Sequence, residues 1–319
     1  MKKEIQNWKI NLEKLSEPLQ KSTSIDLEKM LELEKHILSI SDFLIEKGKE
    51  LPKEELKEAQ IQFRKDTDSV FKMSYLYSRA RKWPKGYPGD YQTLEKIYHG
   101  IPVETEGIGM YLDNYFTTRE LAKGVRERKR VLGKILASEL QNRNPNQRIL
   151  NIACGSSREI FDIGSSINEY KPKITFIDYD KDAVDYSKLL LYNEGISISG
   201  YDFFKFNALK LVSEDDTKLK FGERDIIYSA GLFDYIKTDV LIKMINSLYK
   251  LLGNNGVLIA PFKDRENYNI FDYHWLVDWS YFFQRTIKEV KTILEKATGA
   301  KIEIIKSGSP AINFFIIRR

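Results

Sequence analysis

The second half of the sequence alternates short apolar runs with helical stretches, and this alternation constrains the fold more than any other feature. Strands separated by helices at this spacing form parallel βαβ units, because a parallel neighbour requires a crossover connection. We therefore predict an α/β domain with a mostly parallel sheet, closed by an antiparallel hairpin over residues 301–306 and 311–318. The predicted parallel strands are 149–152, 174–177, 225–228 and 256–260, and the predicted helices between them include 181–193 and 239–252.

Residues 1 to about 82 show helical spacing of apolar residues and no strand-like alternation. Ser24 or Asp26 can cap one helix, and Pro52 is typical of the start of another. Two prolines and two glycines between residues 84 and 89 then force a turn, after which the helical pattern resumes over 91–141. We predict an all-helical N-terminal cap domain at 1–118 and an α/β domain at 119–319.

Composition excludes several classes of protein. Hydrophobic content of 42% and charged content of 30% indicate a globular chain. No apolar run approaches the roughly 20 residues of a membrane span, and no secretory h-region follows the charged start, so we expect a cytoplasmic protein. A single cysteine and three scattered histidines give no basis for a metal site. The net charge of +5 is too mild to indicate nucleic acid.

The first predicted strand runs into residues 151–157 (NIACGSS), a turn of small residues that precedes a helix. Small side chains let backbone N–H groups approach a ligand, and a helix N-terminus favours negative charge. About 20 residues beyond this kind of turn, a carboxylate at the end of the second strand can accept both hydroxyls of a ribose. Asp178 occupies that position. The pattern predicts a nucleotide-binding crevice at the carboxyl ends of the strands.

These segments, with Asp202 to Leu209, Asp225 to Tyr235 and Leu251 to Leu258, resemble the successive motifs of class I S-adenosylmethionine (SAM)-dependent methyltransferases. The resemblance covers about residues 120–319 and implies a Rossmann-like domain with a mostly parallel seven-stranded sheet. It also implies SAM as the cofactor. Three positions depart from the usual pattern. Asn151 stands where an acidic residue is usual, Ser157 where a glycine is usual, and Asn207 where an aspartate often contacts the adenine.

The resemblance implies a set of cofactor contacts. Asp178 would bind the ribose, while Asn207, Ala208 and Tyr179 would form the adenine slot. Arg126 or Arg128 would hold the cofactor carboxylate, since a guanidinium binds a carboxylate bidentately. The expected cofactor-binding residues are Tyr87, Asp90, Arg126, Asn151, Ala153, Gly155, Asp178, Tyr179, Asn207, Ala208 and Ser229.

The turn Gly86-Tyr87-Pro88-Gly89-Asp90 resembles a bacterial subgroup associated with 3-hydroxy fatty acid methyl ester biosynthesis. That subgroup also has an Asp-Trp pair after the fifth strand, similar to Asp278-Trp279. Asp90 is expected either to contact the amino group of SAM as part of a lid or to be a turn residue that binds its own backbone. Some relatives of similar layout cyclise the aminocarboxypropyl arm of SAM into azetidine-2-carboxylate and release methylthioadenosine.

Three functional hypotheses follow. The first is methyl transfer to an oxygen or nitrogen of a small or lipid-like acceptor, a carboxylate included. Candidate catalytic residues are His274, Tyr273 and Tyr91, the first two as bases for a hydroxyl or amine acceptor. The second is cyclisation of SAM with release of methylthioadenosine, and the third is a non-enzymatic SAM-binding regulatory module. Monomer and homodimer remain open, as does the choice of lid or interface for the helical domain.

Overall fold

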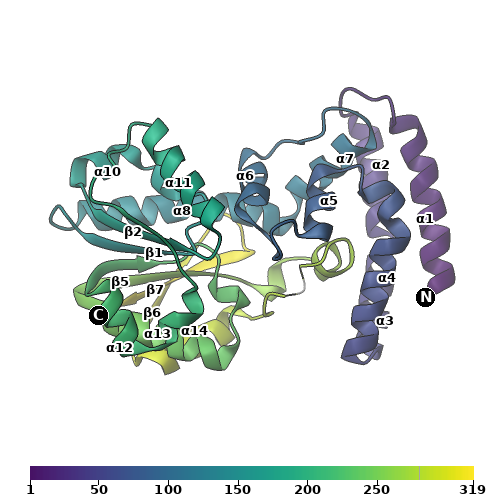
Figure 1. Cartoon of the computed structure of the whole chain (residues 1–319). Coiled ribbons are helices and arrows are strands. Elements are labelled where there is room, and N and C mark those ends of the chain that lie inside the picture. The colour runs from purple at the N-terminus through teal and green to yellow at the C-terminus, as the bar shows by residue number, and fades with distance from the viewer. Residues whose placement is uncertain (280) are drawn as a thin grey trace. The chain divides into compact units, whose positions relative to one another are not determined.

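The computed structural model describes residues 1–279 and 281–319, which form two compact units (Figure 1). Unit 1 comprises Met1–Lys123 and Tyr268–Tyr281, and unit 2 comprises Gly124–Asn267 and Phe282–Arg319. The long helix α8 begins in unit 1 and continues into unit 2. Its bounds are Glu120–Gln141.

Unit 1 is helical, and its helices begin where the sequence offers caps. The Asp26 side chain accepts the Lys29 N–H at the start of α2, and Ser74 caps α5 in the same way by accepting the Tyr77 N–H. Pro52 directly precedes α4, as its fixed φ favours. The helices of unit 1 before α8 are α1 (Lys2–Ser16), η1 (Glu17–Leu19), α2 (Leu27–Leu38), α3 (Ser41–Glu50), α4 (Lys53–Phe71), α5 (Tyr75–Lys82), α6 (Tyr91–His99) and α7 (Gly107–Thr118).

Tyr268–Tyr281 belongs to unit 1, although it lies some 145 residues beyond the other part of that unit. It contains a π-helical turn, η5 (Phe271–Trp275). Trp275 is buried edge-on against Phe63, with ring centroids 5.8 Å apart, and Trp279 packs edge-on against Phe116 at 5.8 Å. The sequence analysis included this segment in the range 119–319, whereas its aromatic side chains pack with the N-terminal helices.

Unit 2 is built on a seven-stranded sheet with the order β3-β2-β1-β4-β5-β7-β6. β1 to β5 are parallel, and β7 pairs antiparallel with both β5 and β6. The predicted Rossmann-like fold and its closing hairpin are confirmed. The strands are β1 (Arg148–Ile152), β2 (Lys173–Asp178), β3 (Asp202–Lys205), β4 (Arg224–Tyr228), β5 (Leu252–Lys263), β6 (Ile302–Lys306) and β7 (Ile312–Arg318).

Helices cover both faces of this sheet, so its central strands are apolar on both sides (Figure 1). One face packs against α8 to α11 and the other against α12 to α14. The helical elements of unit 2 after α8 are α9 (Arg158–Phe161), α10 (Gly164–Tyr170), α11 (Lys181–Asn193), η2 (Ala208–Val212), α12 (Glu214–Phe221), η3 (Phe233–Tyr235), α13 (Thr238–Leu251), η4 (Arg265–Asn267) and α14 (Ile287–Thr298).

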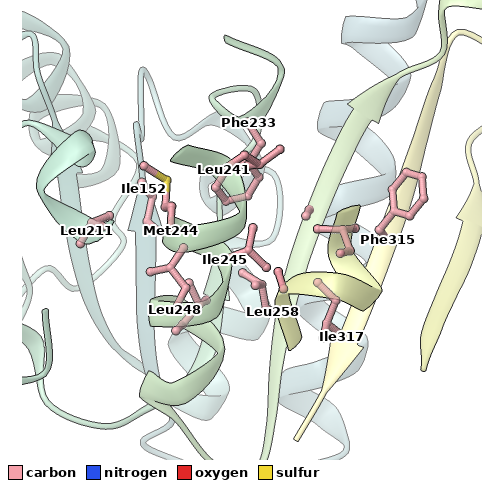
Figure 2. Packing of buried hydrophobic residues seen from close by; sticks show 14 of the residues in the cluster. Ile152, Leu211, Phe233, Leu241, Met244, Ile245, Leu248, Leu258, Phe315 and Ile317 are labelled. Atoms are coloured by element: carbon pink, nitrogen blue, oxygen red, sulfur yellow. The ribbon is translucent and has the colours of Figure 1, made fainter. Parts of the chain in front are cut away.

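Helix α13 shows how the pattern produces the core. Leu241, Met244, Ile245 and Leu248 recur at helical spacing, are fully buried, and point from α13 toward the strands (Figure 2). Truncating one such leucine to alanine typically costs about 2–5 kcal/mol. The core therefore holds the strand ends in register.

Two strands differ from the sequence prediction. The sequence analysis did not predict β3, whose four residues are mostly exposed and lack an apolar run. β5 begins at Leu252 rather than at residue 256, and the residues between Leu252 and Val257 form an irregularity in its pairing with β4. Arg224 pairs with Leu252, but Ile226 already pairs with Val257.

Candidate functional site

The loop between β1 and α9 has three residues in the left-handed region: Ala153 at φ 53°, Gly155 at 54° and Ser157 at 52°. Of these, Ser157 stands where the methyltransferase motif that this loop resembles usually has glycine. A non-glycine residue costs roughly 1–2 kcal/mol in this conformation. The loop thus keeps the glycine backbone geometry at two positions that have side chains. A Cβ on Gly155 would meet no atom within 4 Å, so this residue faces open space.

Asp178 at the end of β2 is joined to this loop by hydrogen bonds. Its Oδ2 accepts the Gly155 N–H at 2.9 Å, and its Oδ1 accepts the Asp180 N–H at 2.9 Å. Burial raises the pKa of the Asp178 carboxyl, and these N–H groups partly offset that rise. The Tyr179 N–H also lies against this carboxylate. A carboxylate has about four acceptor positions, so it can still accept from a ligand hydroxyl.

A buried polar network lies beneath the loop. Asn151 is fully buried at the end of β1, and its Nδ2 donates to Glu159 Oε1 at 3.1 Å. The Tyr228 hydroxyl donates to the same oxygen at 2.8 Å. Ser157, in the loop, receives a 2.7 Å hydrogen bond from Ser187 of α11. Burial raises the pKa of the Glu159 carboxyl. The Asn151 Oδ1 is buried with no hydrogen-bond partner among residues 1–279 and 281–319.

Arg128 of α8 is the most unusual cation of unit 2. It is only 5% exposed, yet its Nε has no hydrogen-bond partner in the described part of the chain. A Cβ on Gly231 would lie 2.8 Å from Arg128 Nη1, so the guanidinium packs against the backbone that follows β4. Arg126 on the same helix is half-buried, and burial lowers the pKa of its guanidinium. Because a buried donor without an acceptor is costly, Arg128 is the better candidate for an anion.

The remaining predicted residues of unit 2 lie at neighbouring strand ends. β3 pairs with β2 so that Lys205 lies opposite Asp178, which brings Asn207 and Ala208 close to the loop. The Asn207 side chain caps η2 by accepting the Leu209 N–H at 3.0 Å. Tyr179 is 66% exposed, and Ser229 at the end of β4 is fully buried. Sheet order therefore gathers the ends of β1, β2, β3 and β4 at one edge.

The predicted residues of the glycine-proline turn lie in unit 1. Asp90 is buried and caps α6, accepting the backbone N–H groups of Gln92 and Thr93. Its carboxylate also accepts the Thr93 hydroxyl at 2.9 Å and pairs with Arg79 at 2.7 Å. Asp90 therefore acts as a helix cap in unit 1. The Tyr91 ring is buried and Tyr87 is half-buried, and their roles toward a cofactor or substrate stay predictions.

The two predicted bases lie in the π-helical turn of unit 1. The Tyr273 hydroxyl accepts the Leu121 N–H at 2.8 Å, and burial raises its pKa well above the usual range. Burial lowers the pKa of His274 to about 4, and the nearby Arg64 lowers it further, against the opposing effect of Asp278. His274 is thus neutral at pH 7 and Tyr273 is protonated. Their catalytic roles remain predictions.

The sequence does not indicate Glu159, and it does not distinguish Arg126 from Arg128 as the partner of the cofactor carboxylate. Glu159 has no motif signal, because its partners Asn151 and Tyr228 come from two different strands. Arg128 is set apart only by its burial, which the sequence does not show. Among the described residues, no group of three or more histidine, cysteine, aspartate or glutamate side chains is arranged to hold a metal ion.

A family model described as "Putative methyltransferase" matches residues 42–259, more than half of the chain. The chain belongs to this methyltransferase family. The match includes most of the helical region as well as β1 to β4. The family and the fold together imply SAM as the methyl donor, and the open glycine loop, the Asp178 carboxylate and the unpaired Arg128 fit its ribose and its carboxylate. The narrower subgroup with the Gly-Tyr-x-Gly-Asp turn is not established by this match.

Several solved structures are similar to this chain. A protein from Bordetella parapertussis described as a possible exported protein is 17% identical, with a TM-score of 0.56, over 72% of this chain and 79% of that chain. Magnesium protoporphyrin IX methyltransferase from Synechocystis PCC 6803, with bound S-adenosylhomocysteine, is 13% identical, with a TM-score of 0.48, over 62% of this chain and 87% of that chain. No curated protein sequence matches. Within residues 1–279 and 281–319, no helix has the length and apolar character of a membrane span.

Proposed function

We propose that this methyltransferase transfers the methyl group of SAM to an oxygen or nitrogen of a small or lipid-like acceptor, carboxylates included. The observation that carries the proposal is the juxtaposition of an open left-handed loop with the Asp178 carboxylate. Both belong to the edge of the sheet at which parallel α/β folds bind nucleotides. Family membership supports the reaction class.

The chain's residues match the nucleoside part of the cofactor. The Gly155 and Asp180 amides hold the Asp178 carboxylate in place, and its oxygens keep acceptor capacity for a ribose hydroxyl. Asn207 and Ala208 begin η2 directly beyond β3, where a backbone amide and a side-chain oxygen can meet an adenine edge. Tyr179 offers an exposed ring beside them.

Arg128 matches the carboxylate of the cofactor's amino acid arm. A guanidinium presents a fork of donors that fits a carboxylate, and Arg128 is buried with its Nε unpartnered. We therefore assign the carboxylate to Arg128 rather than to Arg126. Binding there would give the buried Arg128 Nε–H an acceptor, which it lacks among the described residues.

When bound, SAM supplies a methyl group activated by the positive sulfur. The chain contributes binding and alignment, and it excludes water from the reacting atoms. A carboxylate acceptor is already a nucleophile and needs no base, whereas a hydroxyl or amine acceptor needs one. His274 is neutral at pH 7 because burial lowers its pKa to about 4, and it stays the candidate base. Tyr273 is the weaker candidate, since its oxygen already accepts the Leu121 N–H.

Calorimetric titration with SAM tests the ribose assignment. We expect Asp178→Ala to abolish measurable binding, because it removes both acceptors for the ribose. Asp185→Ala is the matched control, since Asp185 is an exposed carboxylate on the adjacent helix α11 that pairs only with Lys181 among the described residues. Gly155→Ala places a methyl group in the open space of the loop and should weaken binding strongly. Wild-type affinity in Asp178→Ala would refute the assignment.

Identification of the nucleoside product tests the reaction. The protein is incubated with SAM, with and without an extract of small molecules, and the products are identified by mass spectrometry. S-adenosylhomocysteine that forms only with extract supports methyl transfer, and the methylated product identifies the acceptor. Methylthioadenosine formed from SAM alone would refute methyl transfer as the main reaction.

The location and assembly of the chain belong to the same proposal. A cytoplasmic location and a monomeric or homodimeric state stay predictions from the sequence. Fractionation of the native cells and analytical ultracentrifugation would test them.

A further inference from the structure

The unpaired polar atoms under the β1 loop have opposite hydrogen-bonding roles. Asn151 Oδ1 is an acceptor without a donor, and Arg128 Nε is a donor without an acceptor, among the described residues. Both side chains are more than nine-tenths buried. Leaving a buried polar group unsatisfied costs about 1–3 kcal/mol, and more for a charged group. A ligand that supplies both an ammonium and a carboxylate matches this pair.

Glu159 is hydrogen-bonded to the Asn151 side chain, whose Oδ1 is one of these two atoms. Its Oε1 receives the Asn151 amide at 3.1 Å and the Tyr228 hydroxyl at 2.8 Å. It is 3% exposed, and burial raises the pKa of its carboxyl, while the hydrogen bonds from Tyr228 and Asn151 and the positive charge of Arg128 oppose that rise. Glu159 is therefore the carboxylate that lies against the end of β1.

The motif at the end of β1 usually has an acidic residue where this chain has Asn151. Asn151 carries no charge but is hydrogen-bonded to a carboxylate from the first turn of α9. The negative charge is thus present at the expected place but comes from a residue eight positions later. Two carboxylates at this distance would repel each other, which explains why position 151 is an amide in this chain.

We propose that Glu159 replaces the missing motif acid and, with Arg128, selects the zwitterionic α-amino acid end of the ligand. This inference rests on the proposed function, because SAM is the ligand that carries such an end. Glu159 is a positioning and specificity residue and takes no part in the methyl transfer. Its carboxylate holds Asn151 in place and attracts the ammonium, while Arg128 binds the carboxylate.

The test compares the binding of SAM with that of methylthioadenosine, which lacks the amino acid end. Calorimetry is carried out on the full chain with Glu159→Gln, Asn151→Asp and the double variant. Glu159→Gln should weaken SAM binding about 10- to 100-fold, the effect of losing one interaction with a charged group, and leave methylthioadenosine unchanged. Glu214→Gln, which removes an exposed carboxylate paired with Lys250, is the control and should change neither the affinity for SAM nor that for methylthioadenosine.

The double variant separates a charge role from a merely structural one. Asn151→Asp alone brings two carboxylates together and should lower the midpoint of thermal unfolding. Asn151→Asp with Glu159→Gln exchanges the amide and the acid, and it should restore both the midpoint and SAM affinity to within about threefold of wild type. Such rescue would support the proposal that Glu159 supplies the negative charge that Asn151 lacks.

Two results would overturn the inference while leaving the proposed function intact. One is wild-type SAM affinity in Glu159→Gln, and the other is an equal loss of SAM and methylthioadenosine binding without rescue by the double variant. Wild-type protein that binds neither ligand would instead overturn the proposed function, and this inference with it.

Discussion

Asp272 is a buried carboxylate in unit 1 whose removal should stabilise the protein. Its Oδ1 accepts the Tyr115 hydroxyl at 2.8 Å, but its Oδ2 is buried without a hydrogen-bond partner in the described part of the chain. Burial raises its pKa from 3.8 to about 7, with further increases from Glu120 and Glu34. The Tyr115 hydroxyl and Arg119 oppose that rise. Asp272→Asn keeps an oxygen for Tyr115 and removes the charge.

The sign and size of the effect follow from the two pKa values. The folded-state pKa lies above the ordinary value, so the folded protein holds this proton more tightly than the unfolded chain does. The free-energy cost of burying the ionised Asp272 carboxylate is therefore absent below about pH 4. It grows as pH rises toward 7 and is complete above the folded-state pKa. A rise from 3.8 to about 7 corresponds to at most about 4 kcal/mol. We expect Asp272→Asn to raise the free energy of unfolding by about 2–4 kcal/mol at pH 8 and by almost nothing at pH 4.

Tryptophan fluorescence is a suitable probe, because all four tryptophans of the chain (Trp8, Trp83, Trp275 and Trp279) lie in unit 1. Urea unfolding of wild type and variant is measured between pH 4.5 and 8, so that other titrating groups cancel in the difference. Asp42→Asn, which changes an exposed carboxylate on α3, is the control and should alter stability by less than about 0.5 kcal/mol. A stability difference that does not change with pH, or a less stable Asp272→Asn at pH 8, refutes this reasoning.

Three further predictions concern packing. The Cys154 thiol is buried with its pKa raised, so a thiol reagent at pH 8 should label it only after denaturation, and rapid labelling of folded protein would contradict this. Lys263→Met leaves the buried Asp234 carboxylate without its 2.7 Å partner and should cost about 3–5 kcal/mol in urea unfolding, a loss that also changing Asp234 to leucine should largely relieve. Deleting residues 1–118 removes the packing partners of Tyr268–Tyr281, so the truncated chain should bind a hydrophobic dye strongly and aggregate. A monodisperse truncated chain that does not bind the dye would contradict this prediction.

The order of strands and helices in unit 2 could be predicted because each element carries its own signal. Apolar runs such as residues 149–152 and 174–177 become strands, since a central parallel strand is buried on both faces. Asp178 could be located for the same reason, because it ends such a run. β3 could not be predicted, because three of its four residues are exposed and it is held by its pairing with β2.

The same distinction holds for the residues of the candidate site: some follow from a local motif, and others depend on tertiary packing. The glycine-like conformations at Ala153 and Ser157 follow from a motif that is local in sequence. The burial of Arg128 and the carboxylate of Glu159 beside Asn151 do not, because they depend on packing between α8, α9 and the ends of β1 and β4. The sequence shows that position 151 is not acidic, and only the fold shows that the Glu159 carboxyl is hydrogen-bonded to Asn151.

The sequence by itself determined the parallel sheet, the turn of small residues after β1 and the position of Asp178 at the end of β2, because backbone preference and hydrophobic periodicity act over a few neighbouring residues. Tertiary structure decided which charges are buried, which polar atoms lack partners, and which unit Tyr268–Tyr281 joins. Those properties arise when segments far apart in the chain exclude water from each other. Asp272 and Tyr115, 157 positions apart, are one such pair, and no local pattern shows that they meet.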